Sequence, residues 1–208
     1  MKPIINAAPV LHGKRLLIFD FDGTVADTTP LHAAAFSNVL GPLGIVVDYP
    51  GIAGMKTLDA MHKCLVQAGR SPTQEQVAEL TVAKQRCVRQ MIIQELQPLP
   101  GVDDFLRWAK QRYHLAMVTS GSRGTVNLAL EKLGYTDWFS PLIFADDLTR
   151  AKPDPEGFRR ALEITGLPAI KALVFEDSQA GFHAADAAGL TYLDVRNLDW
   201  SVLHRNWS

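Results

Sequence analysis

The stretch that most constrains the fold is LLIFDFDGTVAD, residues 16–27. Its first four residues are apolar and run directly into Asp20, a pattern typical of a buried parallel strand that ends in a turn. Such a strand carries its last carboxylate to the edge where open α/β sheets bind ligands. Asp22 follows two residues later, before a glycine that permits a turn. Two acidic groups at this edge suit a cation, or a reaction that needs a nucleophile and an acid.

Apolar periodicity divides the rest of the chain into two parts. Residues 29–96 show helical spacing throughout, which predicts helices at about 31–40, 55–68 and 72–97. From Gly101 on, helix and strand patterns alternate. The helices are predicted at about 102–112, 126–133, 155–165 and 182–188, and the strands at about 114–119, 142–145, 172–176 and 191–195. This alternation indicates a parallel sheet covered by helices on both faces.

We therefore expect an α/β protein with a Rossmann-like parallel core flanked by helices. Residues 1–28 and 97–208 form this core domain, and residues 29–96 form an inserted, all-helical cap domain. An insertion after the first strand of a parallel sheet lies over the ligand-binding edge. Its two short linkers make the cap a candidate for opening and closing.

The composition and charge of the chain limit the kinds of molecule that it could bind. The 208 residues include 21 basic and 22 acidic ones without a block of like charge, which argues against nucleic acid and anionic membranes as partners. No stretch has transmembrane length, and none resembles a signal peptide. Cys64 and Cys87 match no metal or redox spacing. We expect a cytoplasmic protein with reduced thiols, acting as a monomer or weak homodimer.

Polar residues follow each predicted strand. The second strand ends in TSGS, residues 119–122, whose hydroxyl and N–H groups suit a phosphate. Lys152 precedes a proline after the third strand, in extended backbone from which its ammonium can project. The fourth strand ends in Glu176 and Asp177. Carboxylates, a lysine and hydroxyls are what phosphoryl transfer through a covalent carboxyl intermediate requires, together with a divalent cation.

Four segments together resemble the motifs of the haloacid dehalogenase superfamily. They are DFDGT at 20–24, Ser120 after the second strand, KP at Lys152, and FEDSQAG at 175–181. They occur in the family's order, and the resemblance covers nearly the whole chain. It is closest to the branch that holds β-phosphoglucomutase and small sugar-phosphate phosphatases. This resemblance implies a Mg²⁺-dependent phosphatase that acts on a small phosphorylated metabolite, a sugar phosphate, through an aspartyl phosphate.

The resemblance also implies a role for each matching residue. Asp20 would be the nucleophile, and Asp22 the acid that later activates water. Ser120 would hydrogen-bond the phosphoryl group, and Lys152 would neutralise its charge. Asp177 would be a direct metal ligand, and Glu176 either a ligand or an acceptor behind one. The predicted metal set is Asp20, Asp22 through its main-chain carbonyl, Glu176 and Asp177. The predicted substrate-binding residues are Thr119, Gly121, Ser122, His32 and Lys84.

Some choices stay open at this point. Either Thr119 or Ser120 could supply the phosphoryl-binding hydroxyl, and we favour Ser120 because Gly121 and Ser122 follow it in the family's pattern. His32 could instead be a helix histidine that faces solvent or the domain seam. Lys84 could be an ordinary exposed helix lysine.

Two other functions are also open. One is a mutase of the β-phosphoglucomutase type, whose cap has an arginine just after a glycine. Here the corresponding run is Gly54 to Thr57, with Thr57 in place of the arginine, and Lys56 cannot make a bidentate contact. The other is a non-catalytic binding module. It is disfavoured because none of the acidic and lysine motif residues is missing.

Overall fold

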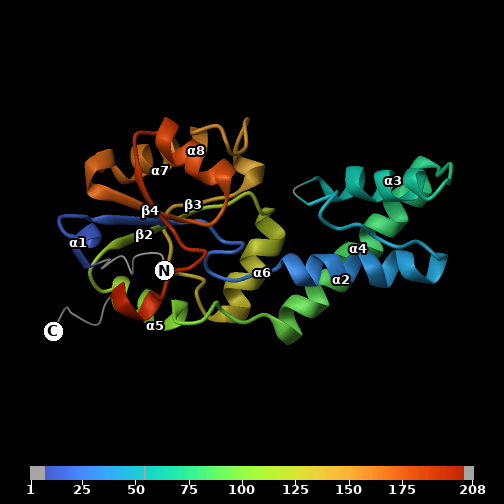
Figure 1. Ribbon diagram of the computed structural model, residues 1–208, viewed down its shortest axis with the longest axis horizontal. Coiled ribbons are helices and arrows are strands. Elements are labelled where there is room, and N and C mark those ends of the chain that lie inside the picture. Colours follow the sequence, from blue (N-terminus) through green and yellow to red (C-terminus); the bar gives the residue numbers. More distant parts are fainter. Residues whose placement is uncertain (1–7, 54, 204–208) are drawn as a thin grey trace. The chain divides into compact units, whose positions relative to one another are not determined.

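The computed structural model describes residues 8–53 and 55–203, and the chain divides into two compact units (Figure 1). The core unit comprises the described residues up to Asp27 and those from Gln97 on. The helical unit comprises Thr28–Leu96. Each unit has a buried apolar core of its own.

A five-stranded parallel sheet lies at the centre of the core unit, with strand order β3-β2-β1-β4-β5. The strands are β1 (Leu16–Phe19), β2 (His114–Val118), β3 (Leu142–Ile143), β4 (Ala172–Glu176) and β5 (Thr191–Asp194). β1 and β4 are buried along their whole length, as expected for central strands covered on both faces. The predicted α/β class is confirmed.

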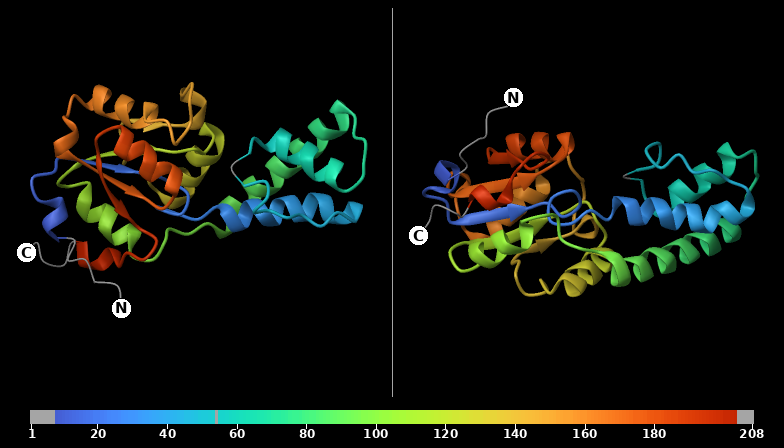
Figure 2. Two further views of the ribbon diagram at one scale, coloured as in Figure 1. Left: turned by 45° about the horizontal axis from the view of Figure 1, so that its top comes forward. Right: turned by 60° about the horizontal axis from the view of Figure 1, so that its bottom comes forward.

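Helices cover both faces of this sheet (Figure 1, Figure 2). One face carries α5 (Val102–Ala109) and α6 (Arg123–Leu133), and the other carries α7 (Glu156–Thr165) and α8 (Gln179–Ala187). The remaining short elements are α1 (Ala8–Leu11), η2 (Ala145–Asp147), η3 (Ala169–Lys171) and η4 (Trp200–Leu203). Alternate strand residues serve the two faces, so Ile18 belongs to the cluster that includes Phe158 of α7, while Phe19 contacts Phe105 of α5 and Trp200.

The helical unit consists of α2 (Thr29–Leu40), η1 (Gly41–Leu43), α3 (Thr57–Gln67) and α4 (Gln74–Glu95). Its core includes Phe36, Met61 and Val77, one from each α-helix. α4 begins one residue after Thr73, whose hydroxyl accepts a hydrogen bond from the Gln76 amide while the Gln76 side chain accepts one from the Thr73 amide. This capping box satisfies two amides at the helix start.

The two chain segments that lead into and out of the helical unit lie side by side in the core unit. Ala26 and Pro98 form an antiparallel bridge, and the Leu99 amide donates a hydrogen bond of 2.9 Å to the Val25 carbonyl. The inserted segment therefore begins and ends at adjacent points of the core.

Several observed bounds differ from the predicted ones: the helix predicted at 102–112 ends at Ala109, for example. For two elements, hydrogen bonds give the reason. The strand predicted at 142–145 ends at Ile143, because the carboxylate of Asp147 accepts a hydrogen bond from the Phe144 amide and η2 begins at the next residue, Ala145. The helix predicted from residue 182 already begins at Gln179, because the Ser178 hydroxyl accepts a hydrogen bond from the Gly181 amide and caps it.

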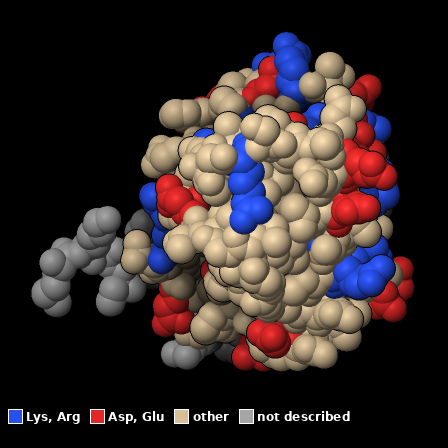
Figure 3. All heavy atoms as spheres, turned by 90° about the vertical axis from the view of Figure 1, so that its right-hand side faces the viewer, with Lys and Arg blue, Asp and Glu red and all other residues tan. Residues whose placement is uncertain are grey.

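The surface shown in Figure 3 carries lysine and arginine side chains interspersed with aspartate and glutamate. No large field of one sign forms on this face. Among the helices of the described chain, none combines the length and the apolar character that a membrane span requires.

Candidate active site

Strand register brings two carboxylates together at the edge of the sheet. Phe19 of β1 pairs with Phe175 of β4, so the next residues, Asp20 and Glu176, follow side by side. The Asp20 amide donates a hydrogen bond of 3.0 Å to the Phe175 carbonyl, which extends the pairing to Asp20 itself. β2 pairs with β1 on the other side and ends one residue before Thr119.

Lys152 joins these two carboxylates. Its Nζ lies 2.7 Å from Oδ1 of Asp20 and 2.7 Å from Oε2 of Glu176. The exposed fractions of the three side chains are 6% for Lys152, 8% for Asp20 and 1% for Glu176. The ammonium is thus shared between two buried carboxylates in charge-assisted hydrogen bonds. The Lys152–Pro153 peptide bond is cis.

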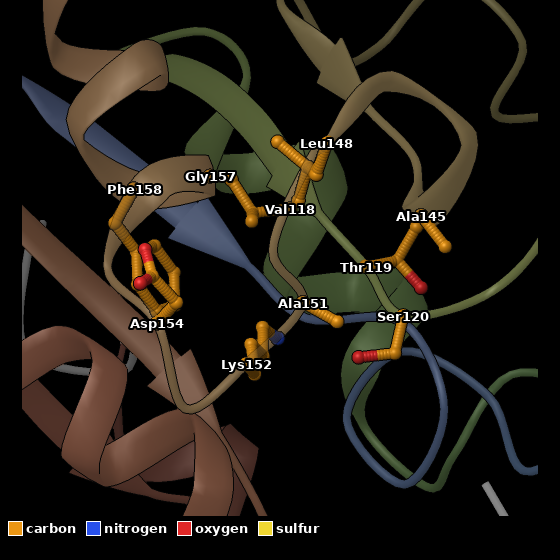
Figure 4. Close-up of a pocket in the computed structure, with 10 residues that line it drawn as sticks. All are labelled: Val118, Thr119, Ser120, Ala145, Leu148, Ala151, Lys152, Asp154, Gly157 and Phe158. Carbon is orange, nitrogen blue, oxygen red and sulfur yellow. The ribbon is translucent and has the colours of Figure 1, made fainter.

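A small pocket lies beside Lys152, at the point where its loop meets the end of β2 (Figure 4). Val118 of β2, Phe158 of α7 and Ser120 line it together with Lys152. α7 packs closely on β2, since a Cβ atom on Gly157 would lie 2.7 Å from Cγ1 of Val118. This close packing brings the loop before α7 next to the end of β2.

The site holds more negative than positive charge. Burial raises the pKa of Asp20 well above its usual value, and the nearby Glu176 and Asp22 raise it further, while Lys152 opposes them. Burial alone would lower the pKa of Lys152, but Asp20 and Glu176 outweigh it and raise that pKa. The pKa of Asp177 is raised to about 6, first by burial and then by Glu176. A surplus of buried carboxylate charge favours the binding of a cation.

The donor set fits a hard divalent cation. Within the described chain, Asp20, Glu176 and Asp177 each offer a carboxylate oxygen, and these atoms lie within 4.8 Å of one another. Gly23 adopts a φ of 77°, and a Cβ atom there would lie 2.1 Å from Oδ2 of Asp177. The Asp177 carboxylate therefore lies against the main chain of the loop that carries Asp22. Clustered oxygen donors are the ligands that Mg²⁺ prefers.

The hydroxyl groups of Thr119 and Ser120 have different surroundings in the structure. The Thr119 hydroxyl accepts a hydrogen bond of 2.9 Å from the Gly121 amide, and the residue is only 2% exposed. Ser120 is exposed and lines the pocket beside Lys152 (Figure 4). A Cβ atom on Gly121 would lie 3.8 Å from Oδ2 of Asp22, so this turn also approaches the second carboxylate. Thr119 therefore supports the turn, and Ser120 is the hydroxyl presented at the site.

The start of α6 is less open to an anion than its sequence suggested. The Arg123 amide, the first of the helix, donates a hydrogen bond of 2.7 Å to Oδ2 of Asp146. The Ser122 hydroxyl donates to the Thr125 hydroxyl at 3.1 Å. The Ser122 hydroxyl, which was predicted to contact a phosphate, and the first amide of the helix thus already have partners within the chain.

His32 and Lys84 contact each other within the helical unit. Nζ of Lys84 lies 2.8 Å from Nδ1 of His32 and 4.8 Å from the ring centre of Phe36. Lys84 is 1% exposed, so the alternative of an exposed helix lysine is wrong. Thr57 is the first residue of α3, and Gly54 lies outside the described residues.

Sequence reasoning missed Ser178. Its hydroxyl donates a hydrogen bond of 2.7 Å to Oε1 of Glu176 and accepts one of 3.0 Å from the Gly181 amide. The available signal was a serine directly before an apolar helical pattern, which is typical of an N-cap.

The chain has a parallel sheet with a helical insertion after the first strand, and a cluster of carboxylates around a lysine at the edge of that sheet. These features are typical of hydrolases that transfer phosphoryl groups. The model of the haloacid dehalogenase-like hydrolase family matches residues 17–195, and the chain belongs to this family. The resemblance inferred from the four motifs is thereby confirmed.

Similar proteins include several phosphatases. Fructose-1-phosphate phosphatase YqaB of Escherichia coli (strain K12) is 32% identical over 184 residues, covering 88% of this chain and 96% of its own. β-Phosphoglucomutase of Bacillus subtilis is 27% identical over 189 residues, covering 87% of this chain and 83% of its own. The crystal structure of CbbY from Rhodobacter sphaeroides in complex with phosphate superposes with a TM-score of 0.74 at 26% identity, covering 86% of this chain and 84% of its own. The family and the relatives named as phosphatases identify the chain as a phosphoric monoester hydrolase.

Proposed function

We propose that this enzyme hydrolyses a small sugar phosphate in a Mg²⁺-dependent reaction, through an aspartyl phosphate on Asp20. The observation that carries the proposal is the Lys152 ammonium, 2.7 Å from both Asp20 and Glu176 at the edge of the sheet, with Asp177 beside them. The name of the Escherichia coli relative, a fructose-1-phosphate phosphatase, supports a sugar phosphate as substrate.

In the first half-reaction, a carboxylate oxygen of Asp20 attacks phosphorus and the bond to the sugar oxygen breaks. Lys152 holds Oδ1 of Asp20, which orients this carboxylate for the attack. Asp22 donates a proton to the departing sugar oxygen. Lys152 and the hydroxyl of Ser120 bind phosphoryl oxygens as negative charge builds on them.

In the second half-reaction, Asp22 accepts a proton from water, which attacks the phosphorus of the aspartyl phosphate. The bond between phosphorus and the Asp20 oxygen breaks, so inorganic phosphate is released and the carboxylate is restored. Asp22 thus serves first as acid and then as base.

Asp20, Asp177 and the main-chain carbonyl of Asp22 would hold the Mg²⁺ ion, with Glu176 either as a further ligand or as an acceptor behind one. When bound, this ion supplies positive charge that stabilises the phosphoryl oxygens during transfer. The same charge offsets the surplus of buried carboxylates that raises the pKa of Asp20.

The helical unit, predicted above as a cap domain, is proposed to supply residues that select the sugar. The half-buried His32 and the buried Lys84 form a hydrogen-bonded pair in this unit, and these two residues are the first choice for that role.

The test is a panel of phosphorylated sugars offered to the purified protein with Mg²⁺, with and without EDTA. We expect free phosphate from at least one sugar phosphate, lost with EDTA and lost in Asp20→Asn. The matched control is Asp104→Asn, an exposed aspartate on α5. An isomerised sugar phosphate with little free phosphate would indicate the mutase, and no turnover of any compound would contradict the proposal.

A further inference from the structure

Both carboxylate oxygens of Glu176 accept hydrogen bonds. Glu176 is 1% exposed, and its Oε2 accepts a hydrogen bond of 2.7 Å from Lys152. Its Oε1 accepts hydrogen bonds from the Ser178 hydroxyl at 2.7 Å, the Ser178 amide at 3.1 Å and the Asp177 amide at 3.3 Å. One oxygen therefore faces Lys152, and the other is held by the start of α8.

The first turn of α8 is shaped to receive this side chain. A Cβ atom on Gly181 would lie 1.9 Å from Cδ and 2.2 Å from Oε2 of Glu176, so the carboxylate lies directly on the helix backbone. Ser178 links the two, because its hydroxyl donates to Glu176 and accepts from the Gly181 amide. Glu176 can reach this position only because residue 181 has no side chain.

A continuous chain of hydrogen bonds thus runs from α8 to the nucleophile. It passes from the Gly181 amide to the Ser178 hydroxyl, and from there to Glu176. It continues through Lys152 to Asp20. Lys152 lies in a connection between η2 and α7, so the contacts of its ammonium to these two carboxylates decide where that ammonium sits.

We propose that Ser178 and Gly181 are positioning residues: they hold Glu176 against α8 so that Glu176 holds Lys152 on Asp20. Ser178 does not touch the reacting atoms and acts through Glu176 and Lys152. This inference rests on the proposed function, because Lys152 is taken to stabilise the phosphoryl group.

The proposal predicts a loss in the chemical step rather than in substrate or metal binding. Ser178→Ala removes one hydrogen bond to Glu176, and we expect kcat to fall about tenfold. KM and the Mg²⁺ concentration for half-maximal rate should stay within about twofold, because on this proposal Glu176 serves Lys152 rather than the metal. Ser178→Thr keeps the hydroxyl and should restore kcat to near the wild-type value.

Two matched controls separate positioning from general destabilisation. Thr73→Ala removes an equivalent cap from α4 and should leave kcat unchanged. Gly181→Ala should lower kcat more than Ser178→Ala, whereas Gly41→Ala, where a Cβ atom would meet nothing within 4 Å, should not. If Gly181→Ala does not fold, the comparison of kcat between Ser178→Ala and Ser178→Thr still tests whether the hydroxyl positions Glu176.

A second measurement is independent of turnover. The ammonium protons of ¹⁵N-labelled Lys152, assigned by their loss in Lys152→Arg, should exchange slowly with water in the wild type because they are buried and hydrogen-bonded. We expect faster exchange in Ser178→Ala and wild-type exchange in Ser178→Thr and Thr73→Ala. This result distinguishes the positioning role from the proposed function, since it holds whether or not the chosen sugar phosphate is turned over.

Two outcomes would overturn the proposal. One is a Ser178→Ala variant with wild-type kcat and wild-type exchange at Lys152. The other is a loss of rate that extra Mg²⁺ fully reverses, because Ser178 would then act on the metal site through Glu176 or Asp177.

Discussion

Nζ of Lys84 in α4 lies 2.8 Å from Nδ1 of His32 in α2, so two basic side chains share one hydrogen bond inside the helical unit. Burial lowers the pKa of Lys84 to about 8. Burial, and then the charge of Lys84, lower the pKa of His32 to about 4. Since Lys84 is a donor when charged, the contact makes Nδ1 of His32 the acceptor and leaves the proton of the neutral ring on Nε2.

The histidine should make stability depend on pH. Its pKa is about 4 in the folded chain and 6.5 when unfolded, so between these values the unfolded state binds more protons. Stability from His32 is complete above pH 6.5 and falls by up to ~3 kcal/mol as the pH drops to 4. Urea unfolding followed by circular dichroism should show a smaller fall in His32→Gln than in the wild type. Equal falls in both proteins would contradict this assignment.

Lys84 should lower the free energy of unfolding at neutral pH. Its pKa is about 8 when folded and 10.5 when unfolded, so the wild type gains stability as the pH rises through this range. Lys84→Met removes this cost but also a hydrogen bond, and we expect a net gain of about 2 kcal/mol at pH 7. The gain should vanish by about pH 10.5. Lys56→Met, at an exposed lysine before α3, is the control and should change little.

Lys152 should be essential for both activity and folding stability. Lys152→Met leaves the buried carboxylates of Asp20 and Glu176 without their shared cation. We expect kcat/KM to fall on the order of 10²–10³-fold, and the free energy of unfolding to fall by about 3–5 kcal/mol at pH 7. Lys132→Met, an exposed lysine in the last turn of α6, is the matched control. Sugar-phosphate hydrolysis and urea unfolding at the same pH measure the two effects, and a Lys152→Met enzyme of wild-type rate would refute the role.

The hydroxyls of Ser120 and Thr119 should differ in their effect on rate. Ser120→Ala should lower kcat about a hundredfold, because it removes the proposed contact to the phosphoryl group. Thr119→Val should mainly lower the melting temperature, since the Thr119 hydroxyl accepts from the Gly121 amide. Steady-state kinetics normalised to folded protein will separate the two. A larger loss of kcat in Thr119→Val would reverse the assignment.

Magnesium should stabilise the protein as well as activate it. A ligand present at 100 times its Kd stabilises the folded state by about 2.7 kcal/mol. The melting temperature of the wild type should therefore rise when Mg²⁺ is added and return to its starting value when EDTA is added. Asp177→Asn should lose most of this rise, and Asp104→Asn should keep it. An unchanged rise in Asp177→Asn would place the ion elsewhere.

The sheet was predictable because its central strands are continuous apolar runs with polar ends. The observed bounds of β1 and β4 equal the predicted ones, and the rule that parallel strands end at one edge indicated that Asp20 and Glu176 follow neighbouring strands. The end of β3 was not predictable in this way, because hydrogen bonds from side chains to the main chain decide it.

Within the site, residue types indicated the chemistry but not the partners. Nothing in the spacing of the motifs shows that one ammonium serves both Asp20 and Glu176, because that contact spans 132 residues and depends on how closely Glu176 approaches Gly181. The pairing of Lys84 with His32 was hidden for the same reason. It depends on the packing of α2 against α4, which sequence periodicity indicates only as a shared apolar face.

The bridge between Ala26 and Pro98 has a consequence for how such an enzyme can change. Because the inserted segment leaves and re-enters the core at neighbouring residues, it can be exchanged for another of different length without altering the spacing of β1 and β2. A short turn joining Ala26 to Pro98, or a foreign helical module grafted there, would leave Asp20 and Lys152 in the core unit while it replaces the residues proposed to select the sugar.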